Sequence, residues 1–566
     1  MFVSQYRVVI LTLLMAGCFA LANGPDPHKV APDQSKKPDA AVSAANIKYD
    51  PLKKARQTRA IKNYEATVPP QCYTKTEGVS NPCWTCHSAS VYPNQLHDWE
   101  LQEEYAFSDQ ALKNYWSNLF VDRTDKIAGI SNEEILAYIR RDNYKPLRDN
   151  LEKRSDYRGY VPDLDLDRGF DSEGFAVDGS DWRALRYKPF PGAFWPTNGA
   201  TDDVFIRLPS KYRTLDGKPN REIYKANLAI LEAVIAAGPI AGEGEDFVFG
   251  VEPISEDTAG VDLNADGRIH GAVNQIKGFP KNYLGDAADE ETKRYIHPKH
   301  TEYLHSVRYV DPDQPGMMAK RMKELRYSRK EKYLDTWAIT RTYEAEYNEK
   351  ENGDVPIFGG SGTMGLLGDF GWRLQGFIED EHGRLRAQTA EETQFCMGCH
   401  NALGVTVDQT FTLARKVPGA DGWRYQDIRG IQDAPQQGQG TPEILTYFQR
   451  VQGGDEFRAN KEIIQRFWPN GKLDEETVLR ASVGGDKDIT FLITPTRQRA
   501  LTLNKAYLSL VREQRFEFGR EVVIGGVENI HTDIVNGDTE LGQTGMVHPD
   551  GRLWLDWLRK ARKDGE

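Results

Sequence analysis

Two short segments of this sequence have the residue types and the spacing needed to attach a haem covalently. Both are Cys-x-x-Cys-His segments, and they consist of Cys83, Cys86 and His87 and of Cys396, Cys399 and His400. Two thiols separated by two residues can reach the two vinyl groups on one edge of a haem and form thioethers, while the adjacent imidazole ligates the iron. The sequence therefore predicts two covalently bound haem c groups, with His87 and His400 as the proximal iron ligands.

Zinc is the alternative occupant of these segments, because two Cys-x-x-Cys pairs can together supply four thiolates. The histidine directly after each pair and the export signal described below favour haem. Cys72 stands outside both segments. It is expected to be a buried thiol, although a free thiol, an intermolecular bridge or an iron-ligating thiolate stay open.

The first residues are typical of an exported protein. Residues 1–22 have one charge, Arg7, then an apolar core, and they end in the cleavage pattern Ala-Leu-Ala of a signal peptide. Residues 14–18 also resemble a bacterial lipobox, in which cleavage precedes Cys18 and that cysteine is lipidated. Both interpretations place the protein outside the cytoplasmic membrane, either soluble in the periplasm or anchored by lipid at Cys18. No later apolar run approaches the length of a membrane helix.

Composition and periodicity predict four regions and a mainly α-helical fold with long ordered loops and little strand, in which the haem sites are embedded in a large irregular scaffold. After the signal peptide, residues 23–60 are expected to be a disordered tether, because they contain few residues that can build a core. Residues 61–350 would form an N-terminal haem region and residues 351–566 a C-terminal one. Helices are predicted after the capping box that starts at Ser131, over 221–237 and over 316–334.

A possible calcium loop lies in the N-terminal region. Asp262, Asn264 and Asp266, followed by Gly267, match positions 1, 3, 5 and 6 of an EF-hand loop. Position 12 is Val273 rather than glutamate, so a further ligand would have to come from elsewhere in the fold. The alternative is a solvated Asp-Gly turn that binds no ion.

No motif identifies the distal iron ligands, and His305 is the candidate that the pattern favours. In residues 303–310, apolar and polar residues alternate, which predicts an extended segment with Tyr303, His305 and Val307 on one face. An imidazole on an apolar face has to be hydrogen-bonded or bound to metal, and both possibilities stay open. His297 is expected to be exposed. The remaining candidates for distal ligands are His97, Met364, Met546 and His548.

On the two Cys-x-x-Cys-His segments, the chain resembles exported bacterial diheme c-type cytochromes. Its two haem motifs and its possible calcium loop are also similar to those of diheme peroxidase-type enzymes, which pair two such haems around a calcium ion. The resemblance implies one-electron transfer between redox partner proteins of the periplasm or membrane. The alternative is a redox enzyme, peroxidase- or oxidase-like, in which one haem keeps an open iron position. The net charge of −12 disfavours nucleic acid as a partner.

Overall fold

The computed structural model describes residues 49–57, 61–76, 80–88, 94–103, 107–236, 247–452, 458–534, 546–550 and 554–560. The predicted signal peptide, the lipobox with Cys18 and most of the predicted tether lie outside these residues. The described chain begins at Tyr49, ahead of the boundary near residue 60 that composition predicts, and Leu52 is fully buried.

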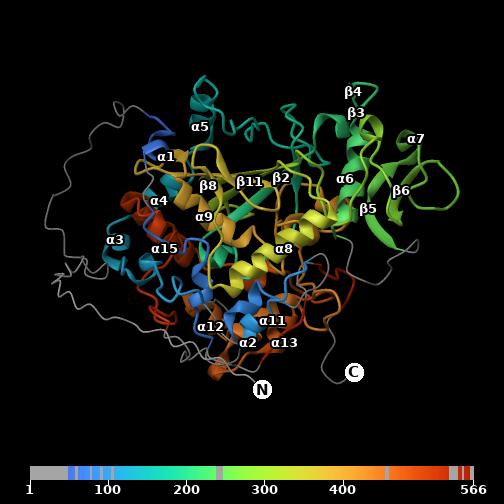
Figure 1. The fold of residues 1–566 in the computed structure, drawn as a ribbon. Coiled ribbons are helices and arrows are strands. Elements are labelled where there is room, and N and C mark those ends of the chain that lie inside the picture. The colour runs from blue at the N-terminus through green and yellow to red at the C-terminus, as the bar shows by residue number, and fades with distance from the viewer. Residues whose placement is uncertain are drawn as a thin grey trace, which may run out of the picture. The chain divides into compact units, whose positions relative to one another are not determined.

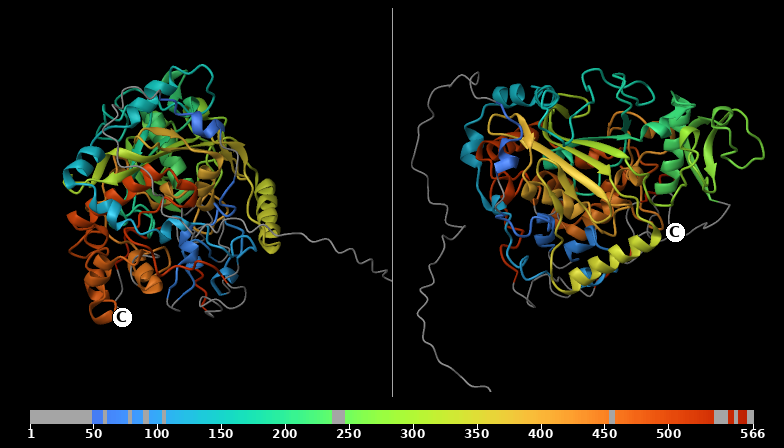
Figure 2. Two further views of the ribbon diagram at one scale, coloured as in Figure 1. Left: turned by 90° about the vertical axis from the view of Figure 1, so that its left-hand side faces the viewer. Right: turned by 45° about the horizontal axis from the view of Figure 1, so that its top comes forward.

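A large antiparallel sheet crosses the middle of the molecule (Figures 1 and 2). Its order is β1-β2-β7-β8-β11-β10-β9, and β12 pairs with β11. Two further hairpins are β3–β4 and β5–β6. The strands are β1 Arg183–Leu185, β2 Thr201–Arg207, β3 Thr214–Leu215, β4 Lys218–Pro219, β5 Val248–Ser255, β6 Ala272–Lys277, β7 Glu302–Val310, β8 Met318–Lys330, β9 Gly359–Ser361, β10 Gly365–Leu367, β11 Trp372–Glu379 and β12 Leu385–Ala387.

Helices surround this sheet, with α5 on one side of it and α11 to α13 on the other (Figure 1). The α-helices are α1 Lys53–Gln57, α2 Glu100–Glu103, α3 Thr124–Ala128, α4 Asn132–Ile139, α5 Tyr144–Leu151, α6 Arg221–Ala236, α7 Glu256–Ala259, α8 Thr336–Glu351, α9 Ala390–Cys399, α10 Thr412–Arg415, α11 Glu443–Val451, α12 Lys461–Phe467, α13 Glu475–Leu479, α14 Thr490–Ile493 and α15 Arg497–Glu513.

The mainly helical fold class predicted from the sequence is therefore wrong, and the segment 316–334 accounts for much of the difference. Its methionines and leucines recur at helical spacing, yet it forms β8, a strand of 13 residues that pairs with β7 on one side and β11 on the other. Its many charged side chains suggested a solvated helix face. Several of them are instead buried in ion pairs, such as that between Arg321 and Glu379, which no periodicity reveals.

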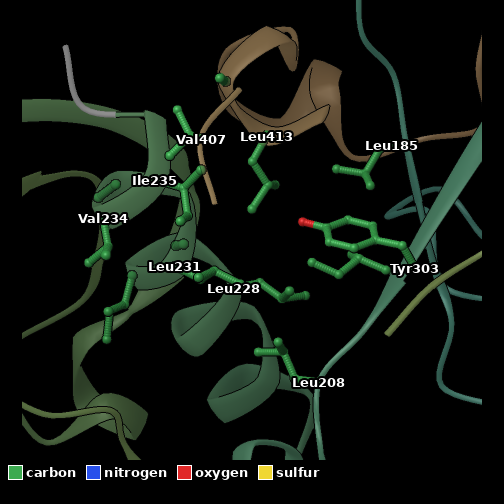
Figure 3. Close-up of a cluster of buried hydrophobic side chains, with 14 of the residues drawn as sticks. Leu185, Leu208, Leu228, Leu231, Val234, Ile235, Tyr303, Val407 and Leu413 are labelled. Carbon is green, nitrogen blue, oxygen red and sulfur yellow. The ribbon is translucent and has the colours of Figure 1, made fainter. Parts of the chain in front are cut away.

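Two predicted helices are confirmed, and both position the sheet. Ser131 accepts a hydrogen bond from the Glu134 N–H and begins α4. Helix α6 lies between the sheet and the β5–β6 hairpin (Figure 1). Its residues Leu228 and Leu231 belong to a buried cluster with Leu413 and with Tyr303 of β7 (Figure 3).

The two faces of the sheet bury different clusters, because successive strand residues point to opposite faces. Phe205 and Leu304 pack on one face with α5. Val204 and Tyr303 pack on the other face with α6 and with Cys396 of the second Cys-x-x-Cys-His segment. The second segment therefore belongs to the core of this second face. Strands β8 and β11 pair directly although they lie on either side of the predicted boundary at residue 350.

Candidate functional site

The first Cys-x-x-Cys-His segment occupies a short 3-10 turn, Pro82–Thr85. Asn81 caps this turn by accepting a hydrogen bond from the Cys83 N–H. The N–H groups of Cys86 and His87 both donate to the Cys83 carbonyl, so the thiols and the imidazole are held by backbone geometry. None of the four cysteines of the two segments is in a disulfide.

The His87 ring is held by Asp98. Its Nδ1 lies 2.8 Å from Oδ2 of Asp98, whose side chain is buried. Burial opposes ionisation of this carboxyl, but His87 and Lys350 more than compensate and lower its pKa. A carboxylate acceptor at Nδ1 favours the tautomer with its proton there, which presents the lone pair of Nε2. That arrangement is typical of a metal-ligating histidine.

The second segment ends a helix. Helix α9 begins with a capping box between Thr389 and Glu392, carries Cys396 and Cys399 in its last turn, and ends at His400. His400 Nδ1 lies 2.9 Å from the carbonyl oxygen of Gln409, an acceptor, so Nδ1 carries the proton here also. Burial lowers the pKa of His400 to about 4, and Arg326 and His305 add to this effect. The imidazole is therefore neutral at pH 7.

The two segments come together although they lie far apart in the sequence. Cys86, Cys396, Cys399 and His400 line the same cavity. A Cβ built on Gly398 would overlap the backbone of Thr67, and one built on Gly404 would overlap Ser88. The chain leading to and following the first segment thus packs directly against the second.

The zinc alternative is not supported in the described part of the chain. No group of three or more histidine, cysteine, aspartate or glutamate side chains there is arranged to hold a metal ion. Burial raises the pKa of the Cys399 thiol to about 11 and that of the Cys83 thiol further still. Cys72 is half-buried in the same region, and burial, then Cys83 and Cys399, raise the pKa of its thiol.

His305 faces the cavity of the second segment. Its strand, β7, is extended as predicted, and Tyr303, His305 and Val307 all line this cavity. The Nε2 atom of His305 lies 3.2 Å from Oδ2 of Asp202, which also accepts a hydrogen bond of 2.6 Å from Tyr187. In this structure the imidazole of His305 is therefore hydrogen-bonded to a carboxylate, which is one of the two alternatives that the sequence leaves open.

His297 is not exposed, and that prediction is wrong. Its side chain is fully buried, with Nδ1 2.9 Å from Asp408 and Nε2 2.9 Å from the Tyr303 hydroxyl. Burial lowers its pKa. The lysines and arginine near it in sequence suggested a solvent-facing segment, but the partner Asp408 comes from beyond the second haem segment. His297 is a core histidine that positions Tyr303.

Of the other candidate ligands, His548 lies beside the first segment. Its ring is 6.2 Å from that of Trp84, and Gln102 donates to the carbonyl oxygens of both His87 and His548. Met364 and Met546 are exposed. Asp98, Gln409 and Asp202, which hold the three imidazoles, had no signal in the sequence, since each lies outside any motif.

The predicted calcium loop forms a tight exposed turn. Asp262 Oδ2 accepts from the Gly267 N–H at 2.8 Å, and Asn264 Oδ1 accepts from the Asp266 N–H at 3.0 Å. Glu256, from α7, accepts from the Leu263 N–H at 2.7 Å and so brings another carboxylate beside the loop. These hydrogen bonds hold the backbone of the turn without an ion. Calcium binding stays a prediction to be tested.

Calcium binding is expected to appear as a lower melting temperature after treatment with EDTA, which excess calcium restores. An ion bound only to the native state stabilises it by about 2.7 kcal/mol when present at a hundred times its dissociation constant. Asp262→Ala removes two turn hydrogen bonds as well, so the informative result is the loss of any response to EDTA in this variant. A wild-type protein that melts at the same temperature with and without EDTA would leave the loop as a turn.

The contact between the two haem segments predicts a strong effect of Gly398→Ala. The added methyl overlaps the Thr67 carbonyl, and overpacking of this kind costs about 1–3 kcal/mol. We expect a lower denaturation midpoint in urea for this variant. Gly250→Ala is the control, because nothing lies within 4 Å of a Cβ at that position. Equal midpoints for the two variants would show that the segments do not pack as described.

Comparisons with known proteins were made on the sequence and on the fold. A family model described as "-like lipoprotein" matches residues 55–482. A protein of Aquifex aeolicus (strain VF5) named "Uncharacterized lipoprotein" is 33% identical over 521 residues, which cover 81% of this chain and 86% of the relative. No solved structure matches. In the described residues, no helix is long and apolar enough to cross a membrane.

These matches correct the family resemblance inferred from the haem segments. Both matches are to lipoproteins, and neither indicates a diheme c-type cytochrome or a diheme peroxidase. The resemblance rested on two pentapeptides. Motifs this short indicate a local chemistry and can occur in proteins that are not related by descent. Lipoproteins are exported and held at a membrane by lipid, which agrees with the predicted export. The family match spans most of the described chain, and the chain belongs to this family of lipoproteins.

Proposed function

We propose that this lipoprotein carries covalently bound haem at both Cys-x-x-Cys-His segments and transfers single electrons to or from a redox partner protein at a membrane surface. The observation that carries the proposal is the state of the two imidazoles. Each has its Nδ1 held by an acceptor, Asp98 for His87 and the Gln409 carbonyl for His400. Each therefore presents Nε2, the atom that a haem iron would require.

The surrounding residues fit such a group at the second segment. The cavity is lined by aromatic side chains, among them Phe190, Phe194 and Phe411, which would exclude water from a porphyrin. The ring of Phe411 lies 5.5 Å from that of His400, edge to face, and restrains its orientation. Arg326 also lines the cavity and supplies positive charge. Bound haem would contribute one-electron cycling of its iron, tuned by this burial and charge.

The convergence of the segments supports transfer between two haems within one molecule. Cys86 of the first segment lines one cavity with Cys396, Cys399 and His400 of the second, so groups attached at the two sites would be neighbours. At the membrane, lipidation of Cys18 would hold the chain. The partner is expected to be a periplasmic or membrane redox protein, and the net charge of −12 suits a basic docking surface on it.

Covalent attachment is the first expectation to test. Acid-acetone extraction is expected to leave the haem on the protein, and a pyridine haemochrome assay to give two haems per chain. Cys396→Ser combined with Cys399→Ser removes both thioether positions at one site and is expected to halve the haem content. Cys72→Ser is the control and should retain both haems. Extraction of haem from the wild type, or a full haem content in the double variant, would contradict attachment at the second segment.

A second function is favoured by a specific observation, the pairing of Asp202 with His305. A carboxylate that holds an imidazole beside a cavity is the arrangement expected of a general acid-base pair. If Nε2 of His305 stays with Asp202, it is not an iron ligand, and the second site would keep an open iron position. The protein would then be a redox enzyme acting on peroxide, oxygen or an oxidisable substrate.

Spectra of the resting protein distinguish the two functions. For the enzyme we expect one high-spin haem that binds cyanide, and His305→Ala should slow its reaction with hydrogen peroxide by about 10²–10⁴-fold, the usual contribution of general acid-base catalysis, without changing the spin state. Two low-spin haems that bind neither cyanide nor carbon monoxide would exclude the enzyme. A low-spin haem that becomes high-spin in His305→Ala would instead identify His305 as its ligand.

A further inference from the structure

Lys323 is placed in the cavity by an irregularity of the sheet. Strands β7 and β8 pair Val307 with Glu324 and then Arg308 with Met322, so Lys323 is an extra residue without a partner on β7. This is a β-bulge, which redirects a side chain and is frequent beside functional sites. The Lys323 side chain is buried, and it lines the cavity that also contains Cys396, Cys399 and His400.

Among the described residues, the ammonium group of Lys323 has no carboxylate partner of the kind that three other fully buried lysines have. Lys188, Lys330 and Lys416 pair with Glu443, Asp408 and Glu232, respectively. For Lys323, no carboxylate within the described chain lies at ion-pair distance. Its Nζ donates to the Gly199 carbonyl at 2.5 Å and lies 4.2 Å from the centre of the Tyr507 ring.

The two carboxylates that act on the pKa of Lys323 already bind other groups. Glu324 binds Arg326 and Arg520, and Glu379 binds Arg321 and the hydroxyls of two tyrosines. Burial is the largest effect on the pKa of Lys323 and lowers it to about 7, with Glu379 and Glu324 opposing this and Arg458 adding to it. A charged amine in this position is costly unless an anion approaches it.

Arg520 provides a second donor at the same cavity. Its side chain is buried and lines the cavity, and its guanidinium lies 4.5 Å from the ring of Phe395, directly before Cys396. Two of its nitrogens bind Glu324 and the Glu392 carbonyl, but Nε has no hydrogen-bond partner within the described chain. Lys323, Tyr507 and Arg520 all line this cavity. Two cationic groups with unused donors thus face the cavity.

We propose that Lys323 and Arg520 form a carboxylate-binding site for an amphiphilic occupant of this cavity, whose apolar body would pack among the aromatic side chains. The carboxylate has two chemically equivalent sources. One is a propionate of a haem attached at Cys396 and Cys399, and this source rests on the proposed function. The other is a diffusible carboxylic acid, which needs no haem. An ammonium or guanidinium binds a carboxylate more strongly than it binds a neutral group of the same shape.

The test compares full-length wild type with Lys323→Met, Arg520→Gln and the charge-retaining Lys323→Arg. Lys320→Met is the matched control, because Lys320 lies on the same strand, outside this cavity and largely exposed. The probes are hexanoate and, as its uncharged counterpart, hexanamide, with binding followed by calorimetry and by melting temperature. The same variants, matured with haem, are titrated electrochemically.

If the carboxylate is a haem propionate, Lys323→Met lowers the midpoint potential of one haem, because loss of a nearby cation favours the ferric state, and Lys323→Arg restores it. Hexanoate then binds only to chain produced without haem. If the carboxylate is diffusible, hexanoate binds the haem-loaded wild type, and Lys323→Met weakens it about tenfold or more, while hexanamide does not bind.

The proposal is overturned if Lys323→Met and Arg520→Gln change neither a haem potential nor hexanoate binding relative to Lys320→Met. Binding of hexanamide as tightly as hexanoate would also overturn it, since the site would then be apolar only. If extraction removes the haem, the proposed function fails, yet hexanoate binding to the haem-free chain still decides whether the carboxylate site exists.

Discussion

The close contact of Gly398 with the backbone of Thr67 is the constraint on which the candidate site depends. No side chain fits between these two segments, so the last turn of α9 lies directly against the chain that leads to the first Cys-x-x-Cys-His segment. The contact brings together cysteines and imidazoles that sequence alone leaves unrelated. Because α9 also packs on β10 and β11, the sheet determines where the second segment lies, and the second segment determines where the first can lie.

Charge buried along β8 is the other organising feature. A central strand is usually apolar on both faces, but β8 carries Arg321, Glu324 and Lys330 in the interior. Each has a partner from another element, Glu379 for Arg321, Arg520 for Glu324 and Asp408 for Lys330. Burial opposes the ionisation of Glu324, yet Arg326 and Arg520 lower its pKa to about 2, so the Glu324 carboxyl is ionised at neutral pH. Lys323 stands out because the same strand leaves it unpaired.

Structure that depends on neighbouring residues can be predicted from the sequence, whereas contacts between residues distant in sequence cannot. The cap of α4, the length of α6 and the face of β7 that carries His305 follow from residue type and spacing within a few positions. Strand β8 was predicted as a helix because its apolar spacing fits both structures and its ion-pair partners lie elsewhere in the chain. His297 was misplaced for the same reason, since Asp408 is distant in sequence. The cysteines and histidines of the two segments stand out in the sequence, while Asp98 and Gln409, which orient the imidazoles, do not.

The same reasoning explains why two pentapeptides gave the wrong family. Cys-x-x-Cys-His is the spacing that covalent haem attachment needs. Unrelated folds can provide it by placing two thiols and an imidazole on one turn. Here the first segment uses a 3-10 turn and the second uses the end of an α-helix. What the two share is an acceptor at Nδ1, a carboxylate in one case and a backbone carbonyl in the other. Because these acceptors differ in charge, His87 should be the more electron-rich ligand. Two irons bound in this way would differ in potential, and that difference would give electron transfer between them a direction.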